Sequence, residues 1–239
     1  MTEIISIDYS LNSSGVTIYN CDTKVYRFLS FVNVYKDKKT EAIADNISNA
    51  VNILKYYRSP IKAVKTQKNG LSGWEKDHIN NCIEFNKQLS DFICNNISLE
   101  NKNILVLENY SYGSSSDTLI QIVENTMELK SNLLKSIFFD VEDIFLVTAP
   151  QVKKYVGSGN FDKHDLLQAF IALRDENIIH NDYHLILANY TQDFISKKNK
   201  KGKEIFEVTT PIDDINDSFW INKYFQHFFG DFILSSKRN

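Results

Sequence analysis

The residues next to the amino terminus constrain the fold most strongly. An isoleucine-rich run, Glu3–Ile7, ends in the carboxylate of Asp8, and a polar turn closed by Gly15 leads into a second β-branched run, Val16–Tyr19. This pattern predicts two antiparallel strands with an acid at the carboxyl end of the first. An acid in apolar surroundings is costly unless a cation meets it. Two interpretations stay open, because Asp8 either faces such a cation or hydrogen-bonds the turn.

The rest of the chain predicts a mixed α/β domain. Three antiparallel strands are followed by strands that alternate with helices, a pattern typical of a mixed sheet with helices packed on it. A length of 239 residues suits one large domain, so we expect a single domain over residues 1–239. After the opening hairpin, the expected elements are a strand over Lys24–Val34, helices over Thr40–Tyr57 and Trp74–Asn95, a strand over Ile104–Leu107, a helix over Asp117–Phe139, a strand over Ile144–Val147, a helical turn opened by Pro150, a helix over Asp162–Arg174 and a closing helix after Pro211.

Composition limits the classes of function. Hydrophobic residues make up 43% of the chain, enough for a packed core, and the net charge of -3 gives no overall nucleic-acid footprint. DNA binding would therefore depend on local patches and bound metal ions. The three cysteines form no C-x-x-C pair, and neither a signal peptide nor a membrane-length apolar run is evident. We expect a cytoplasmic protein, of a bacterium or a virus-infected cell, with no membrane partner.

Four carboxylates stand at positions that a fold of this kind can bring together. Asp8 and Glu108 each end an apolar strand, and Asp214 and Asp217 lie three residues apart on one face of the closing helix. If the two strands are neighbours, their ends place Asp8 and Glu108 side by side. Four acids without basic partners repel one another, and a hard divalent cation such as Mg²⁺ or Mn²⁺ resolves this with oxygen ligands. For the helix alone, ordinary N-terminal acids that meet the helix dipole are the commoner explanation.

These segments resemble a known family. Asp8 in IISIDYSLNSSGV, Glu108 in ILVLENY and the pair Asp214/Asp217 in DIND resemble the acidic tetrad of RuvC-type Holliday-junction resolvases, which have an RNase H-like fold. The segment APQVK at 149–153, followed by GSG and by Asp162-Lys163, is similar to a further motif of that family. Tyr9-Ser10 stand where the family usually has Pro-Gly, and residues near 60–100 and 176–210 read as insertions, as in a divergent viral or phage member.

The resemblance implies a fold, an activity and a metal site. The fold would be an RNase H-like mixed five-stranded sheet, its first three strands antiparallel, with helices on both faces. The activity would be structure-selective DNA cleavage, resolving four-way or branched junctions by paired phosphodiester hydrolysis. Two Mg²⁺ ions, replaceable by Mn²⁺, would be held by Asp8, Glu108, Asp214 and Asp217. The protein would act as a homodimer, with the helix over Asp117–Phe139 either at the dimer surface or wholly in the core.

The same resemblance implies DNA contacts, each with a structural alternative. Lys153 and Lys163 would neutralise phosphate charge, although a solvated helix face explains either lysine alone. The expected stacking residues are Tyr110 and Tyr112, which could equally pack their own loop. A basic hairpin tip would contact a DNA arm or simply be solvated, and its residues are Lys198, Lys200 and Lys201. A supporting role of His164 or Asp213 at the site stays open, while His180 and His184 are interpreted as structural.

Three other functions fit parts of this pattern. A nuclease of the same fold acting on RNA–DNA hybrids or flaps would need the same carboxylates. Actin-like and sugar-kinase ATPases share the fold, but they are longer and carry a second Asp-x-Gly-type phosphate loop, which is not found in the sequence. A non-catalytic DNA-binding relative would gain nothing from clustered acids beside phosphate.

Overall fold

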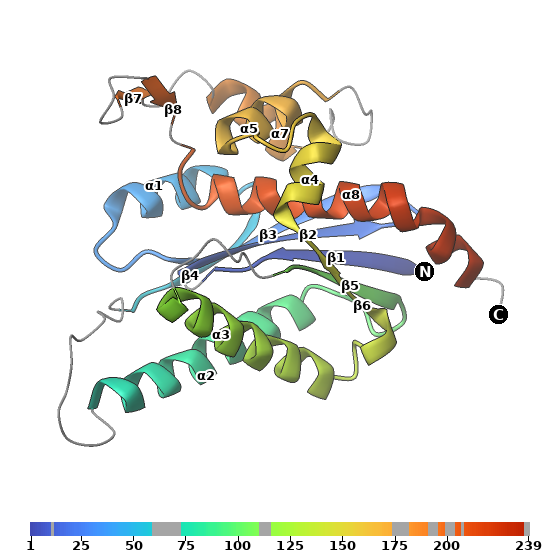
Figure 1. Ribbon diagram of the computed structural model, residues 1–239, viewed down its shortest axis with the longest axis horizontal. Coiled ribbons are helices and arrows are strands. Elements are labelled where there is room, and N and C mark those ends of the chain that lie inside the picture. The colour runs from blue at the N-terminus through green and yellow to red at the C-terminus, as the bar shows by residue number, and fades with distance from the viewer. Residues whose placement is uncertain are drawn as a thin grey trace.

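The computed structural model describes residues 1–10, 12–58, 73–109, 116–173, 182–190, 196–198, 204–206 and 208–236. Its centre is a six-stranded sheet in the order β4-β3-β2-β1-β5-β6, with helices on both faces (Figure 1). The strands of the sheet are β1 (Thr2–Asp8), β2 (Ser13–Asn20), β3 (Val25–Asn33), β4 (Asn52–Tyr56), β5 (Lys102–Glu108) and β6 (Ile144–Val147). The helices are α1 (Lys38–Ile47), α2 (Gly73–Cys94), α3 (Ser116–Lys135), α4 (Ala149–Val156), α5 (Lys163–Ile171), α7 (Asp182–Tyr190) and α8 (Ile212–Ser236), with a short 3-10 turn η1 (Val141–Asp143).

The strand pairing confirms the predicted fold class, with one strand more than expected. β1 pairs antiparallel with β2, which pairs antiparallel with β3, while β5 lies parallel to β1 and β6 parallel to β5. These five strands and the helices on both faces form the predicted RNase H-like mixed sheet. The sixth strand, β4, runs parallel to β3 at the edge of the sheet.

The extra strand corrects the predicted helix over Thr40–Tyr57. The helix ends at Ile47, and residues 52–56 pair with β3 instead. Asparagine and serine are frequent between residues 46 and 52, and their side chains compete for backbone groups and weaken a helix. Pairing with β3 satisfies the backbone groups on one side of this edge strand, and Ile53 packs against the cluster of Val32, Val34 and Ala44.

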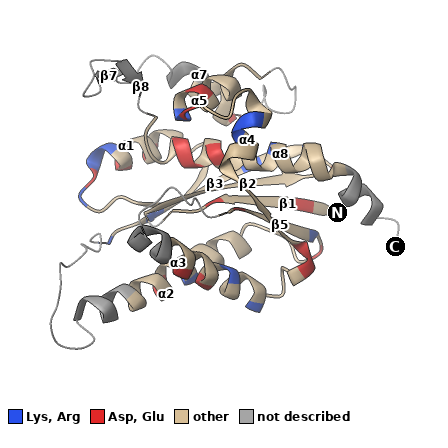
Figure 2. Ribbon diagram, in the orientation of Figure 1, with Lys and Arg blue, Asp and Glu red and all other residues tan. Residues whose placement is uncertain are grey.

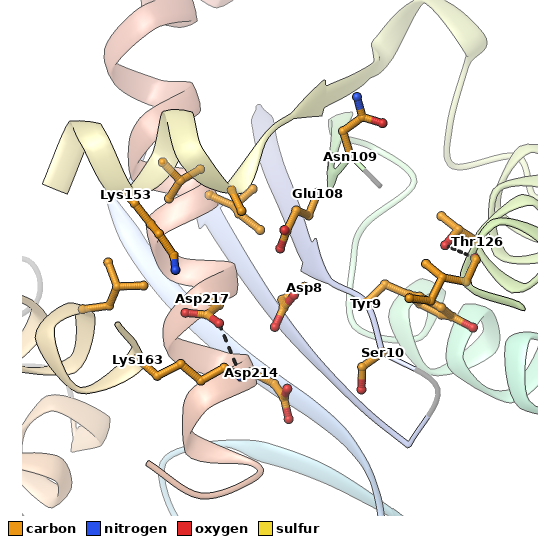
Figure 3. Close-up of a pocket in the computed structure, with 15 residues that line it drawn as sticks. Asp8, Tyr9, Ser10, Glu108, Asn109, Thr126, Lys153, Lys163, Asp214 and Asp217 are labelled. Atoms are coloured by element: carbon orange, nitrogen blue, oxygen red, sulfur yellow. Dashed lines mark hydrogen bonds and ion pairs between the residues drawn. The ribbon is translucent and has the colours of Figure 1, made fainter. Parts of the chain in front are cut away.

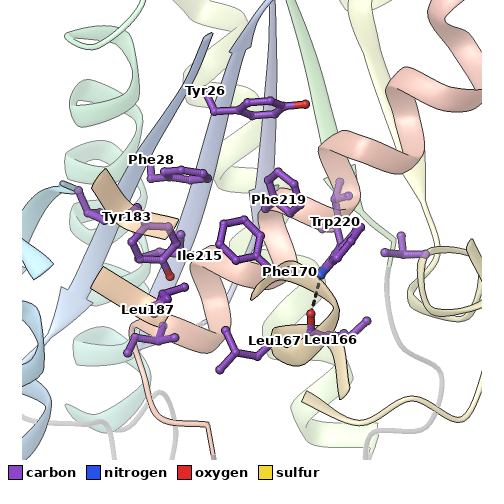
Figure 4. Packing of buried hydrophobic residues seen from close by; sticks show 14 of the residues in the cluster. Tyr26, Phe28, Leu166, Leu167, Phe170, Tyr183, Leu187, Ile215, Phe219 and Trp220 are labelled. Atoms are coloured by element: carbon purple, nitrogen blue, oxygen red, sulfur yellow. Dashed lines mark hydrogen bonds between the residues drawn. The ribbon is translucent and has the colours of Figure 1, made fainter. Parts of the chain in front are cut away.

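Alternate residues of β1 supply two cores on opposite faces of the sheet. Ile5 and Ile7 pack with residues of α2 and α3, and Ile4 packs on the other face with residues of α5, α7 and α8. Figure 4 shows the second core, in which Phe28 and Phe219 meet the ring of Phe170 from α5. The indole of Trp220 donates a hydrogen bond to the backbone carbonyl of Leu166, 2.9 Å, which ties α8 to α5.

Polar contacts fix α8 across the middle of the sheet. The buried amide of Asn222 donates to the carbonyl oxygens of Ile4 and Thr17, at 3.0 and 3.3 Å, one on each of the two central strands. The hydroxyl groups of Thr17 and Ser218 lie 2.8 Å apart. These contacts set the position of α8 along its axis, and therefore the position of the acids in its first turns.

Two segments were predicted to be insertions. Helix α2 lies within residues 60–100 and packs on α3 and the sheet. Only parts of residues 176–210 are described. These are α7, residues 208–210 shortly before α8, and a small hairpin of β7 (Ser196–Lys198) and β8 (Glu204–Phe206). None of the helices searched among the described residues is long and apolar enough to cross a membrane.

Candidate metal centre

The four predicted acids meet at one place in the fold. Asp8 is the last residue of β1 and Glu108 the last of β5, and these strands lie side by side in parallel. Asp214 and Asp217 lie in the first turns of α8, which packs across β1 and β2 and begins beside the end of β1. Figure 3 shows all four side chains directed into a common space. They line a cavity of about 330 Å³, so the predicted convergence is present in the structure.

A glycine allows α8 to approach the sheet this closely. Gly15 on β2 pairs with Asp8 on β1 and lies directly under the start of α8. A Cβ atom at Gly15 would lie 2.0 Å from the backbone oxygen of Asp214 and 2.5 Å from the nitrogen of Ile215. The residue that closes the first turn in the sequence therefore also sets the distance between α8 and the strand end that carries Asp8.

Burial raises the pKa of all four acids, and repulsion between carboxylates adds to the rise at Asp8, Asp214 and Asp217. Burial, followed by the charges of Asp217, Glu108 and Asp214, raises the pKa of Asp8 well above its ordinary value. Burial, and then the neighbouring charge of Asp213, raises the pKa of Asp214 to about 8, and burial raises that of Asp217 to about 7. The pKa of Glu108 is raised by burial as well, and its carboxyl group shares a hydrogen bond with Asp8. Without a cation, Asp214 and Asp217 therefore bind protons up to about neutral pH.

Two lysines lie beside the acids, and they are Lys153 and Lys163, the two that the resemblance assigned to phosphate contacts. The ammonium of Lys163 lies 2.6 Å from Asp213 Oδ2 and 3.7 Å from Asp217 Oδ2. Burial alone would lower the pKa of Lys163, but the charges of Asp213 and Asp217 outweigh it and raise that pKa. Lys153 also lines the cavity, with its nitrogen directed toward Asp217 (Figure 3). Basic residues on α4 and α5 thus lie beside the acidic start of α8 (Figure 2).

The residues present fit a hard divalent cation. Asp214 Oδ2 and Asp217 Oδ1 are buried and have no hydrogen-bond partner among the residues that the structure describes. Leaving buried carboxylate oxygens unpaired is costly, whereas cation ligation would satisfy them. The described lining contains neither cysteine nor histidine, so the donors are oxygen atoms, as Mg²⁺ and Mn²⁺ prefer.

Other predicted residues lie elsewhere or cannot be placed. Histidine 184 is buried, with Nε2 3.1 Å from the carbonyl oxygen of Ile171, in agreement with a structural role. His164 is in the first turn of α5, where it could group with Asp162 and Asp165, two acids that form the capping box of that helix. Lys198 is the last residue of β7. Residues outside the described ranges are Tyr110, Tyr112, His180, Lys200 and Lys201.

The cavity also contains residues that the sequence did not single out. Tyr9, Ser10 and Asn109 directly follow the acids at the strand ends, so their place in the sequence could have predicted that they line the site. Burial raises the pKa of Tyr9, whose ring packs edge-on against Phe85 of α2. Ala149 and Val152 belong to the APQVK segment that the sequence analysis noted. The remaining lining residues come from distant helices with no comparable signal, and these are Ile122, Thr126, Leu166 and Ile221.

Comparisons with known proteins add the following. No family model matches the sequence, and the search of curated proteins found no match. Among solved structures, one match is RuvC of Thermus thermophilus, with 8% identity and a TM-score of 0.46, covering 95% of this chain and 96% of that one. Another is T. thermophilus RuvC in complex with Holliday junction substrate, with 7% identity, the same TM-score of 0.46 and the same coverage. At this level of identity no correspondence between individual side chains follows.

Proposed function

We propose that this chain is a metal-dependent, structure-selective DNA endonuclease that resolves four-way or branched junctions by paired phosphodiester hydrolysis. One observation carries the proposal: four carboxylates from three separate elements converge on one cavity that two lysines also line, and some of their buried oxygens have no hydrogen-bond partner within the described ranges. Stability alone gives no reason to gather these charges, because each raises the cost of burying the others.

The cation site would be formed by Asp8, Glu108, Asp214 and Asp217. Bound divalent ions would lower the pKa of an attacking water and stabilise the leaving oxygen of a phosphodiester. The acids would release their protons on ligation, so cation affinity should increase as the pH rises. The charges of the other three carboxylates each raise the pKa of Asp8. From the resemblance of its motif, Asp8 would help to hold both ions of a two-ion site.

The chain's own cations would act on the substrate. Lys153 and Lys163 line the cavity beside the acids, where they could neutralise the charge of a phosphate drawn into the site. Acids alone would repel a phosphate of the DNA backbone. With lysines beside the acids, the site can hold such a phosphate. The lining also includes apolar residues, among them Val152 and Leu166.

The choice of a four-way junction rests on the resemblance of the sequence motifs, not on the cavity. A junction needs two symmetric cuts, and a two-fold homodimer would deliver them. Helix α3 is the proposed dimer surface. Its Leu129 and Leu133 are buried against the sheet, whereas Met127 is 54% exposed and available for contact with a second subunit.

The test is cleavage of a panel of labelled substrates. Four-way junction, replication fork, duplex and RNA–DNA hybrid would each be incubated with Mg²⁺ and with EDTA. Symmetric nicks in the junction, dependent on Mg²⁺, are expected. Cleavage of the hybrid alone would assign the site to a ribonuclease H activity, and cleavage unaffected by EDTA would refute the metal-dependent mechanism.

A further inference from the structure

A fifth acid, Asp213, is buried next to the cluster but does not line the cavity. It is 8% exposed and lies in the first turn of α8, directly before Asp214. Its Oδ2 lies 2.6 Å from the ammonium of Lys163, while its Oδ1 has no hydrogen-bond partner in the described part of the chain. A carboxylate at this position raises the free-energy cost of burying the other acids, and its ion pair with Lys163 offsets that cost.

Lys163 is held between two acids of one helix. Asp213 and Asp217 are four residues apart and share a face of α8, and the ammonium lies 2.6 Å from the first and 3.7 Å from the second. Lys163 opens α5, which the capping box of Asp162 and Asp165 fixes at its start. Its side chain is nevertheless 50% exposed, so its flexible stem could extend into solvent if nothing held its end.

We propose that Asp213 is a positioning residue that holds the ammonium of Lys163 over the cavity, ready to contact a substrate phosphate. The inference rests on the proposed function and extends it. Asp217 is a candidate cation ligand, so a bound cation would compete for its contact with Lys163. The contact with Asp213 lies outside the cavity and is not subject to that competition. Asp213 would therefore keep the lysine in place when the site is loaded.

Two other roles for Asp213 give different results. If Asp213 were a further cation ligand, its replacement would weaken cation binding, as removal of a ligand or of its support does by about 10–100-fold. If its ion pair with Lys163 only stabilised the fold, replacement would lower the melting temperature and leave turnover unchanged. Neither result is expected from a residue that positions Lys163.

The kinetic test compares Asp213→Asn, Lys163→Met and the double variant. Asp213→Asn should lower kcat on junction DNA by about 10–100-fold, the effect of a misplaced catalytic contact, with the Mg²⁺ concentration for half-maximal rate unchanged. The double variant should be no slower than Lys163→Met, because Asp213 acts through the lysine. Additive losses, or a raised Mg²⁺ requirement, would overturn the proposal. Asp143→Asn is the matched control, since Asp143 pairs with Lys102 at 3.1 Å and does not line the cavity.

A structural readout separates this inference from the proposed activity. In a metal-free crystal structure of the wild type, Lys163 should lie between Asp213 and Asp217. In crystals soaked in Mn²⁺, the ammonium should keep its contact with Asp213 in the wild type, whereas in Asp213→Asn it should leave the cavity or lose ordered density. An ammonium that stays at its wild-type position in the soaked variant would refute the positioning role. This comparison is decisive even if the wild type cleaves none of the nucleic acids tested, a result that would refute the proposed function.

Discussion

Replacing Gly15 with alanine tests how the sheet sets the position of the acids. The added Cβ would lie 2.0 Å from the backbone oxygen of Asp214 and 2.2 Å from its carbonyl carbon, where real Cβ atoms essentially never come within 3.0 Å. The start of α8 must therefore retreat by at least about 1 Å, because the opposing atoms are backbone and cannot rotate away. Asp214 and Asp217 would move with it.

The size of the effect follows from this displacement. Overpacking of a tight contact typically costs about 1–3 kcal/mol in the free energy of unfolding. A misplacement of about 1 Å in a catalytic constellation costs about 100-fold in rate. Without the clash, Gly15→Ala should instead raise the free energy of unfolding, because alanine in a strand is favoured over glycine by about 0.5–1 kcal/mol.

The assay combines urea unfolding, followed by circular dichroism, with Mg²⁺-dependent cleavage of junction DNA. Gly159→Ala is the control, because no atom lies within 4 Å of a Cβ built there, and its stability should stay within about 0.5 kcal/mol of the wild type. A Gly15→Ala protein that is as stable and as active as the wild type would refute the claim that this close approach positions the acids.

Three further predictions follow from the site and its support. Asp8→Asn should abolish cleavage and leave junction binding largely intact in a gel-shift assay; an active variant would remove Asp8 from the site. The raised pKa values of Asp214 and Asp217, about 8 and 7, mean that the folded state binds these protons more tightly than the unfolded chain. Stability of the metal-free protein should therefore fall as the pH rises from about 4 to 8, and Mg²⁺ should restore it at the upper end. The prediction would be contradicted if, in EDTA, the melting temperature of the wild type rose from pH 4 to 8 while that of Asp214→Asn did not change with pH. Asn222→Ala leaves two buried carbonyls with fewer donors and should cost about 1–3 kcal/mol in urea unfolding, and a neutral result would show that α8 is held by its apolar contacts alone.

Local sequence pattern was sufficient for the strand ends and for the convergence of the acids. Asp8 and Glu108 each end an apolar run, and the three-residue spacing of Asp214 and Asp217 places both on one helical face. Once β1 and β5 are neighbours, these positions can only meet at one edge of the sheet. Ile4 and Ile5 of β1 are adjacent and lie on opposite faces of the sheet, where each packs into a core.

Features that depend on tertiary contact could not be predicted in this way. The segment over residues 52–56 has helical spacing, and only the free edge of β3 decides that it forms a strand. Lys163 and Asp213 are fifty residues apart, and nothing local indicates that α5 brings them to 2.6 Å. Gly15 reads as a turn residue in the sequence, whereas its close contact with Asp214 depends on where α8 crosses the sheet.

The central claim is that these acids hold a divalent cation, and anomalous diffraction from a crystal soaked in Mn²⁺ tests it most directly. Anomalous density is expected in the cavity between Asp8, Glu108, Asp214 and Asp217, and it should be absent from an Asp8→Asn crystal treated in the same way. A cavity without anomalous density, in crystals that bind Mn²⁺ only elsewhere, would contradict the claim.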